Sequence, residues 1–304
     1  MHRVLTESHR QESALPGLAV TPNTLADLIR HLTAEFDCVT VTEGLKRLHA
    51  HSAPARPLLA LTFDDGRRDN FLYARPILNA YNVPATFYIP AGFVGSSELL
   101  WHDAVGYAAA AFITSGRTRE LNKLLRTNMK YRDAQHASHW TANHLKSFHE
   151  NDRRQIELLL QREAGEFELP VFERSMDWND LRQLVREGHE IGSHTMTHAV
   201  LGENQTHRLE AEIVTSKSVL EENLSVEIRS FSYPTGATSE SAVEWVSRAG
   251  YESAVTTQAG VNCSQTPTLH LRRINIQEDQ NHSADGRLNE AVLSWRMARA
   301  AGAV

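Results

Sequence analysis

The sequence contains little cysteine and no long hydrophobic segment. Its 304 residues include two cysteines, Cys38 and Cys263, and no Cys-x-x-Cys pair. This scarcity argues against a disulfide framework and a thiolate zinc site. The first thirty residues lack a basic segment followed by an apolar one, and no stretch is long enough to cross a bilayer. We therefore expect a cytoplasmic protein that does not insert into a membrane.

Basic residues are slightly fewer than acidic ones. Lysine and arginine number 31 against 37 aspartates and glutamates, a formal net charge of −6. This balance argues weakly against nucleic acid or an anionic membrane surface as the main partner. The hydrophobic content of 41% and the charged content of 22% are ordinary for a globular protein. A chain of this length can bury a substantial core, but its composition does not indicate an oligomeric state.

Two adjacent carboxylates follow an apolar run. Residues 57–63 are nearly all hydrophobic, which is typical of a strand buried on both faces of a parallel sheet. Asp64 and Asp65 then emerge at its carboxyl end, where sites in α/β folds collect, and Gly66 permits a sharp turn. The alternative is that one aspartate caps the helix that begins near Asp69 and the other is a solvated loop charge.

A pair of histidines lies further along the chain. His194 and His198 are four residues apart, so one helical turn would place both imidazoles on one face. Two neutral imidazoles and a carboxylate form the ligand set of many catalytic zinc sites, which keep a position open for water. Alternatively, these are two surface or capping histidines among the sixteen in the chain. Combined with a strand that ends in Asp64 and Asp65, the pair indicates a site for a divalent metal.

These segments resemble the first two motifs of the polysaccharide deacetylase family, carbohydrate esterase family 4, also called the NodB homology domain. Thr-Phe-Asp-Asp-Gly at residues 62–66 and His-Thr-x-x-His at residues 194–198 match residue for residue. The order and intervening pattern agree from about residue 57 to about residue 276. The resemblance implies an α/β fold, a distorted (β/α) barrel, with Asp64 as the general base. It also implies that the metal is held by Asp65, His194 and His198.

Residues 231–236 resemble the third motif, Phe-Arg-x-Pro-Tyr-Gly. The resemblance implies that the backbone N–H of Thr235 is the oxyanion donor and that Tyr233 and Pro234 line the substrate site. The same four residues that end in Gly236 also fit an ordinary turn.

Two positions of the third motif depart from the family. Thr235 stands where the motif has a tyrosine, but a backbone donor does not depend on the side chain. Ser232 stands where the motif has an arginine, and in the family that arginine orients the catalytic base. Asp64 therefore needs another partner. Candidates by residue type alone are Arg229, Arg272 and Arg273.

Two further site residues are less clearly marked. The family's last motif, Leu-x-His, supplies the general acid, and it does not appear clearly in residues 269–276. His270 is the nearest histidine and our candidate for the acid. Trp101 could form part of an aromatic wall for a sugar, or it could pack the surrounding helices onto the barrel.

The chain is predicted to form one deacetylase-like domain over residues 1–304. Its core comprises residues 57–94 and 175–276, preceded by a βα extension at residues 1–56. The βα alternation stops between residues 95 and 174, where amphipathic helical patterns predict an insertion. A last helix is expected at about residues 289–300.

Three functions fit this pattern. The resemblance favours a metal-dependent hydrolase that removes an N-acetyl group from an amino sugar of a surface polysaccharide, a lipopolysaccharide or their precursor. Its cofactor would be one divalent ion, Zn(II) first, with Co(II), Ni(II) or Mn(II) as alternatives. The second function is hydrolysis of another C–N amide bond, and the third is a non-catalytic carbohydrate-binding barrel. The intact residues Asp64, Asp65, His194 and His198 argue against the third.

Overall fold

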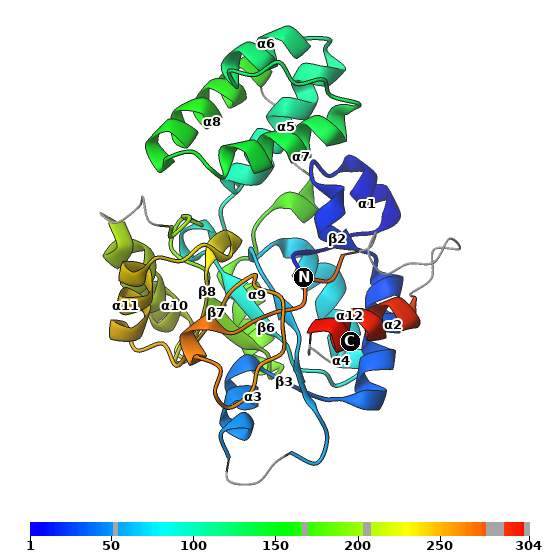
Figure 1. The fold of residues 1–304 in the computed structure, drawn as a ribbon, viewed down its shortest axis with the longest axis vertical. Helices are drawn as coiled ribbons and strands as arrows, with labels where there is room; N and C mark the ends of the chain where they lie inside the picture. Colours follow the sequence, from blue (N-terminus) through cyan, green and yellow to red (C-terminus); the bar gives the residue numbers. More distant parts are fainter. Residues whose placement is uncertain (51–53, 166–169, 203–207, 278–288, 301–304) are drawn as a thin grey trace.

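The computed structural model describes residues 1–50, 54–165, 170–202, 208–277 and 289–300. Its central element is a five-stranded parallel sheet, in which strands that follow one another along the chain are neighbours. The strands are β5 (Thr62–Phe63), β6 (Thr86–Ile89), β7 (Glu190–Ser193), β8 (Ser230–Ser232) and β9 (Ser253–Val255). Helices connect the strands and cover the outer face of this curled sheet (Figure 1). The expected α/β fold is confirmed, and its curled parallel sheet forms a half-barrel.

The apolar run at residues 57–63 forms two short strands instead of the single predicted one. β4 (Leu58–Ala60) pairs in parallel with β3 (Asp37–Val39), whereas β5 joins the central sheet beside β6. The division occurs at Leu61, whose side chain is buried in the main core. Further along, the rings of Phe63 and Phe87 stack with centroids 5.0 Å apart, and this contact fixes β5 against β6.

The N-terminal residues form two short strands and a helix. β1 (Arg3–Val4) pairs in parallel with β2 (Ala19–Val20), and α1 (Glu7–Glu12) lies between them. The backbone N–H of Asp64 donates to the carbonyl oxygen of Met1 at 3.1 Å. The first residues of the chain therefore run beside the end of β5, next to the paired aspartates.

The helices around the sheet begin at the capping residues that the sequence offers. In α2 (Pro22–Glu35) the side chain of Thr21 accepts a hydrogen bond from the N–H of Thr24, and proline occupies the first turn. Asp177 forms a capping box at the start of α9 (Trp178–Arg186). The other helices of this layer are α3 (Val41–Leu48), α4 (Arg75–Ala80), α10 (Ser216–Leu224), α11 (Glu240–Arg248) and α12 (Glu290–Ala300).

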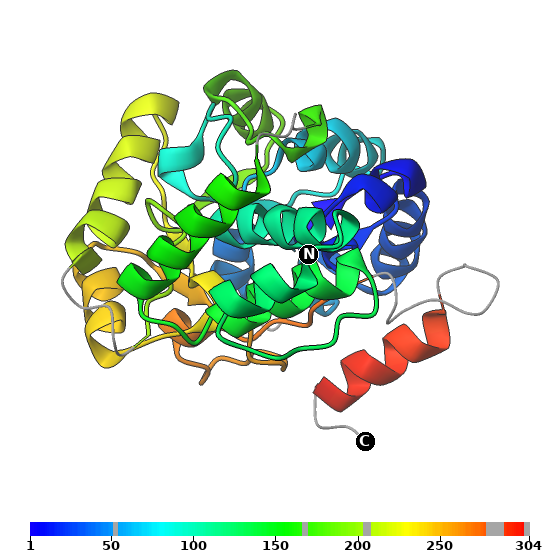
Figure 2. The ribbon, with the colours of Figure 1, turned by 90° about the horizontal axis from the view of Figure 1, so that it is seen from above.

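A second helical layer lies at one end of the molecule. It consists of α5 (Trp101–Thr114), α6 (Thr118–Leu124), α7 (Ala134–Leu145) and α8 (Glu150–Ala164). These helices have a hydrophobic cluster of their own, in which Phe112 and Leu145 are fully buried. Seen from above, they lie over the middle of the molecule, whereas α12 lies at its edge (Figure 2). Among the described residues, no helix is both long and apolar enough to cross a membrane.

Candidate metal centre

Asp64 and Asp65 follow β5 directly, at the carboxyl edge of the sheet. The backbone of Asp65 has φ +74° and that of Gly66 φ +61°, so the chain turns sharply as it leaves the strand. A Cβ atom at Gly66 would lie 3.3 Å from side-chain atoms of both Ile89 and Pro90. Glycine is thus required here both for its backbone conformation and for the close approach of β6.

The structure brings three of the predicted ligands together. One ligand atom each from Asp65, His194 and His198 lies within 4.8 Å of the other two. The Nε2 atoms of His198 and His194 lie 3.2 Å and 3.5 Å from Oδ1 of Asp65. All three side chains are buried. Two imidazole nitrogens and one carboxylate oxygen at these separations fit a divalent metal ion with open positions for water.

The histidine spacing does not arise from a helical turn, as the sequence pattern had indicated. Residues 194–198 form an irregular loop after β7, and both Thr195 and His198 have positive φ angles. The carboxylate of Glu212 accepts hydrogen bonds from the backbone N–H groups of Met196 and Thr197 at 3.0 Å and 2.8 Å. A strained loop fixed by one buried glutamate thus places the two imidazoles.

Neighbouring groups orient the ligands and set their charge. Nδ1 of His194 donates to the carbonyl oxygen of Ser232 at 2.7 Å, which leaves Nε2 facing Asp65. Burial by itself would raise the pKa of Asp65, but hydrogen bonds with His194 and His198 hold it well below its ordinary value. Burial also lowers the pKa of His198. Asp65 is therefore the anionic ligand, and the lowered pKa of His198 favours the neutral imidazole that metal ligation requires.

Asp64 has a different partner. Nη1 of Arg273 donates to Oδ1 of Asp64 and Nη2 donates to Oδ2, both at 2.8 Å. Burial would raise the pKa of Asp64, but the charge of Arg273 holds it well below its ordinary value. Of the three arginines named from the sequence, Arg273 is the one that contacts the base. Arg229 pairs with Glu227 instead.

Two further histidines lie near the metal centre. His102, from the start of α5, has its Nε2 3.7 Å from Oδ2 of Asp65, and burial lowers its pKa to about 4. His2 is close enough for the charges of Asp65 and Asp64 to affect its pKa, which burial lowers. Its Nδ1 is buried and has no hydrogen-bond partner among the described residues. His2 carries no local motif, because β1 brings it to the site by tertiary pairing alone.

The other predicted site residues differ in exposure, since Trp101, Tyr233 and Pro234 are buried whereas Thr235 and His270 are half-buried. The Trp101 ring packs in the core of the helical layer with the Arg153 guanidinium 4.6 Å from its centre, which favours the packing role. Tyr233 is fully buried, and the ring of His270 stacks 6.3 Å from it. Thr235 lies in a 3-10 turn with φ +60° beside the buried Pro234. The catalytic roles of these residues stay predictions.

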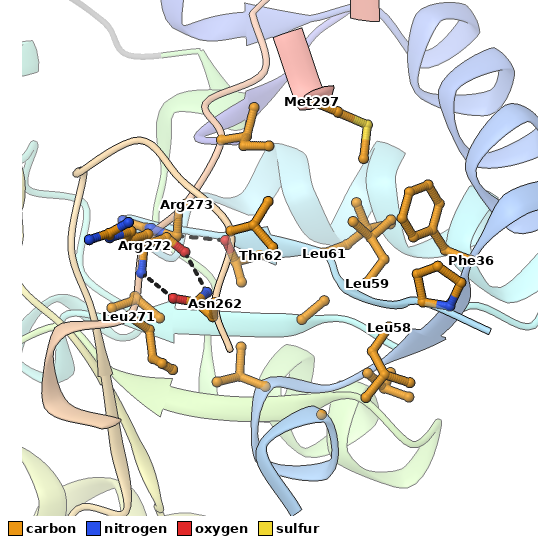
Figure 3. Close-up of a pocket in the computed structure, with 18 of the residues that line it drawn as sticks. Phe36, Leu58, Leu59, Leu61, Thr62, Asn262, Leu271, Arg272, Arg273 and Met297 are labelled. Atoms are coloured by element: carbon orange, nitrogen blue, oxygen red, sulfur yellow. Dashed lines mark hydrogen bonds between the residues drawn. The ribbon is translucent and has the colours of Figure 1, made fainter. Parts of the chain in front are cut away.

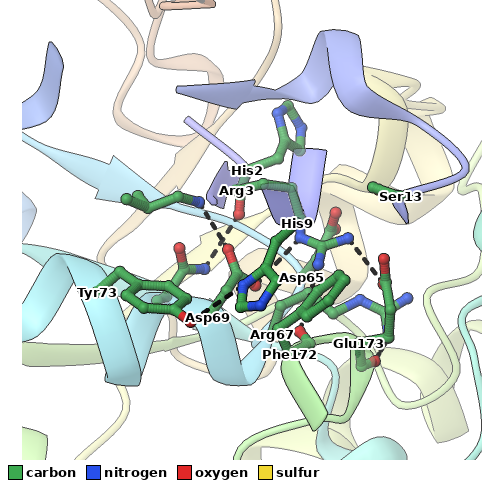
Figure 4. A network of polar contacts seen from close by, with 12 residues as sticks. His2, Arg3, His9, Ser13, Asp65, Arg67, Asp69, Tyr73, Phe172 and Glu173 are labelled. Atoms are coloured by element: carbon green, nitrogen blue, oxygen red, sulfur yellow. Dashed lines mark hydrogen bonds and ion pairs between the residues drawn. The ribbon is translucent and has the colours of Figure 1, made fainter. Parts of the chain in front are cut away.

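A buried charged network surrounds the segment that follows Asp65, and Figure 4 shows its members Arg3, Arg67, Asp69 and Glu173. Arg67, which is fully buried, donates to the carbonyl oxygen of Glu173 at 2.8 Å and pairs with the carboxylate of Asp103 in α5. Arg3 pairs with Asp69 at 3.1 Å and with Glu173 at 2.9 Å. The segment that follows Asp65 is thus tied to elements distant in sequence.

The curled parallel sheet and the buried aspartate-histidine-histidine set at its carboxyl edge define an α/β protein with a candidate mononuclear metal site. The model of the polysaccharide deacetylase family matches residues 51–254, well over half of the chain. The chain therefore belongs to the polysaccharide deacetylase family.

Known proteins and structures agree with this family. YxkH of Bacillus subtilis, whose name assigns it provisionally to the polysaccharide deacetylases, is 19% identical over 257 residues. The match covers 84% of this chain and 65% of YxkH, so the chain spans just under two thirds of that relative. Two solved structures have a similar fold. One is the Streptococcus pyogenes deacetylase PplD in complex with acetate, with a TM-score of 0.64 and 18% sequence identity over 97% of this chain and 94% of that chain. The other is IcaB from Ammonifex degensii, with a TM-score of 0.62 and 18% sequence identity over 98% of this chain and 94% of that chain.

Proposed function

We propose that this protein is a metal-dependent hydrolase that removes an N-acetyl group from an amino sugar of a surface polysaccharide, a lipopolysaccharide or their precursor. The observation that carries the proposal is the pair of adjacent buried aspartates with separate partners. Asp65 faces two imidazoles, whereas Asp64 faces an arginine. Such a division supplies one ligand and one base, which hydrolysis of an unactivated amide requires. The similarity to PplD, a deacetylase whose structure holds acetate, supports the same reaction class.

The proposed metal ligands are Asp65, His194 and His198, with Zn(II) as the first choice and Co(II), Ni(II) or Mn(II) as alternatives. When bound there, the ion supplies a Lewis acid that makes water nucleophilic near neutral pH. Asp64 accepts the proton of the attacking water, for which its depressed pKa keeps it ionised. A carboxylate has about four acceptor positions, so pairing with Arg273 leaves Asp64 able to accept from water.

The oxyanion that forms at the acyl carbon would receive a hydrogen bond from the N–H of Thr235. One preorganised donor of this kind is worth about 3 kcal/mol of transition-state stabilisation. Tyr233 and Pro234, which shape the turn before Thr235, would line this side of the substrate site.

Collapse of the tetrahedral species requires a proton for the leaving amine. His270 is the candidate from the sequence, and His2 is the candidate from the structure because it lies near both aspartates. Separate His2→Gln and His270→Gln variants distinguish them. The variant that lacks the acid should lose at least tenfold in kcat with unchanged metal content. If neither loses activity, neither histidine is the acid.

Acetate release tests the proposed function directly. The chelator-treated protein, reloaded with Zn(II) or Co(II), is incubated with N-acetylated amino-sugar oligomers, and acetate is measured enzymatically. We expect metal-dependent release that the Asp64→Asn variant lacks. Release of another product from cyclic or linear amides, without acetate, would favour a different amidase. Binding of glycans with no hydrolysis at any metal loading would contradict the proposal.

A further inference from the structure

The proposed base, Asp64, has an arginine partner that lies outside the third motif. We propose that Arg273 positions the carboxylate of Asp64, the task that the family's third motif gives to an arginine at the place of Ser232. This inference rests on the proposed role of Asp64 as the base. Its support is geometric, since two parallel hydrogen bonds of 2.8 Å join the two side chains. A bidentate arginine-carboxylate pair fixes both the distance and the plane of the carboxylate.

Arg273 is itself held from several sides. Its Nε donates to the carbonyl oxygen of Thr256 at 2.9 Å, and its Nη1 lies 3.3 Å from Oγ1 of Thr62. Its backbone N–H donates to the carbonyl oxygen of Gln258 at 2.9 Å. These partners follow β9 or lie in β5, so the guanidinium is fixed relative to the same sheet that carries Asp64. A guanidinium held in this way loses little freedom when it binds the carboxylate.

Ser232 explains why the arginine can come from elsewhere. Its Oγ lies 3.4 Å from Oδ2 of Asp64 and 3.4 Å from Nη2 of Arg273, and the residue is fully buried. The small side chain leaves room for the guanidinium that arrives from position 273. An arginine at position 232 would compete for the same carboxylate oxygens. An arginine at either position 232 or position 273 can therefore pair with Asp64, but not both at once.

The chain offers a matched control next to Arg273. Both Arg272 and Arg273 line a cavity of about 460 Å³, whose other walls are largely apolar. Figure 3 shows Arg273 and Thr62 at one end of this cavity and Phe36 at the other. Arg272 is exposed, and its backbone N–H donates to the side chain of Asn262. Removing Arg272 therefore alters the cavity and the net charge without touching the base.

The test compares Arg273→Ala, Arg273→Lys and Arg272→Ala in the Zn(II)-loaded protein. The probes are an N-acetylglucosamine pentamer, followed by acetate release, and 4-nitrophenyl acetate. We expect Arg273→Ala to lose about 10–100-fold in kcat with little change in KM and with the metal content of the unmodified protein. Arg273→Lys should recover only part of this loss, because an ammonium cannot form the bidentate pair. Arg272→Ala should keep full activity.

Chemical rescue provides a readout that a merely structural role would not affect. Truncation at position 273 leaves a space continuous with the cavity, which a small guanidinium compound can enter. Methylguanidinium at millimolar concentration should therefore restore part of the kcat of Arg273→Ala, and it should have no effect on Arg272→Ala. Full activity of Arg273→Ala would overturn the inference. Loss of metal in parallel with activity, without rescue, would overturn it equally.

Failure of the proposed function can be told apart from failure of this inference. If the unmodified protein hydrolyses neither probe, the proposed function is in doubt, and crystal structures decide the role of Arg273. In Arg273→Ala the Asp64 carboxylate should then turn away from its position in the unmodified protein while Asp65 stays in place. An unchanged Asp64 would exclude a positioning role whatever the reaction.

Discussion

The two adjacent aspartates differ in chemistry because their partners differ. Asp65 interacts with the Nε2 atoms of His194 and His198. A cation bound by these three residues would neutralise the negative charge of Asp65. Asp64 has an arginine as its partner, which keeps it ionised and fixes its plane. One dipeptide can thus provide a metal ligand and a proton acceptor. This division gives each aspartate a distinct mutational effect.

Replacing Asp64 by asparagine should separate catalysis from metal binding. The amide keeps nearly the same size but cannot accept the proton of the attacking water, so kcat should fall by about 10²–10⁴-fold. Metal content should stay at the level of the unmodified protein, as elemental analysis can verify. A variant with full turnover would show that another group is the base.

The ion pair between Asp64 and Arg273 should make stability depend on pH. The folded-state pKa of Asp64 lies below the ordinary value of 3.8, so the carboxylate stabilises the fold above that pH and loses this contribution as acid is added. In Arg273→Ala the buried carboxylate lacks its cation, and its pKa should rise. The difference in free energy of unfolding between the two proteins should be largest near pH 7 and shrink toward pH 4. Urea unfolding at both pH values measures it, and a difference that grows on acidification would contradict the assignment.

At the scale of elements, the sequence predicts the metal ligands in the loop after β7 but not the conformation of that loop. The residues His194 and His198 and their convergence on a carboxylate could be predicted, because the motif spacing is specific. Their backbone conformation could not, since a spacing of four also fits a helix and the contacts that select the loop come from Glu212 on a later segment. The partner of Asp64 could not be predicted from the sequence either. Three arginines were candidates by type, and only tertiary pairing distinguishes Arg273.

Glu212 should control the affinity for metal through this loop. Its carboxylate also accepts a hydrogen bond from Oγ1 of Thr197 at 2.7 Å, and the side chain is almost fully buried. Glu212→Ala should release the loop and weaken metal affinity by about 10–100-fold. Titration of the chelator-treated protein with Zn(II) and a competing indicator measures this loss. Glu210→Ala, at an exposed position two residues earlier, is the matched control and should bind as tightly as the unmodified protein.

At the scale of the whole molecule, the helical layer and the sheet are joined by buried charges. Arg67 follows the turn at Asp65 and Gly66, and its partners Asp103 and Glu173 lie at the start of α5 and near the start of α9. Helical patterns could indicate α5 to α8, because their amphipathic spacing is local. The network could not be predicted in the same way, since its members are distant in sequence and nothing in the local pattern marks a charge as buried.

Removing one member of this network should destabilise the protein strongly. Asp103→Ala leaves the guanidinium of Arg67 buried without its carboxylate, and breaking such a pair costs about 3–5 kcal/mol. Urea unfolding followed by circular dichroism measures the change. Asp152→Ala, at an exposed position in α8, should stay within about 0.5 kcal/mol of the unmodified protein. Equal stability of both variants would show that the buried pair does not hold the layer in place.

The metal content of the purified protein tests the central claim most directly, because it does not depend on a guessed substrate. After chelator treatment and reloading, elemental analysis should find about one divalent ion per chain, and the His194→Ala variant should have lost it together with its activity. That result would establish the three buried ligands as a metal centre. Absence of metal after reloading, or full occupancy in His194→Ala, would contradict the account.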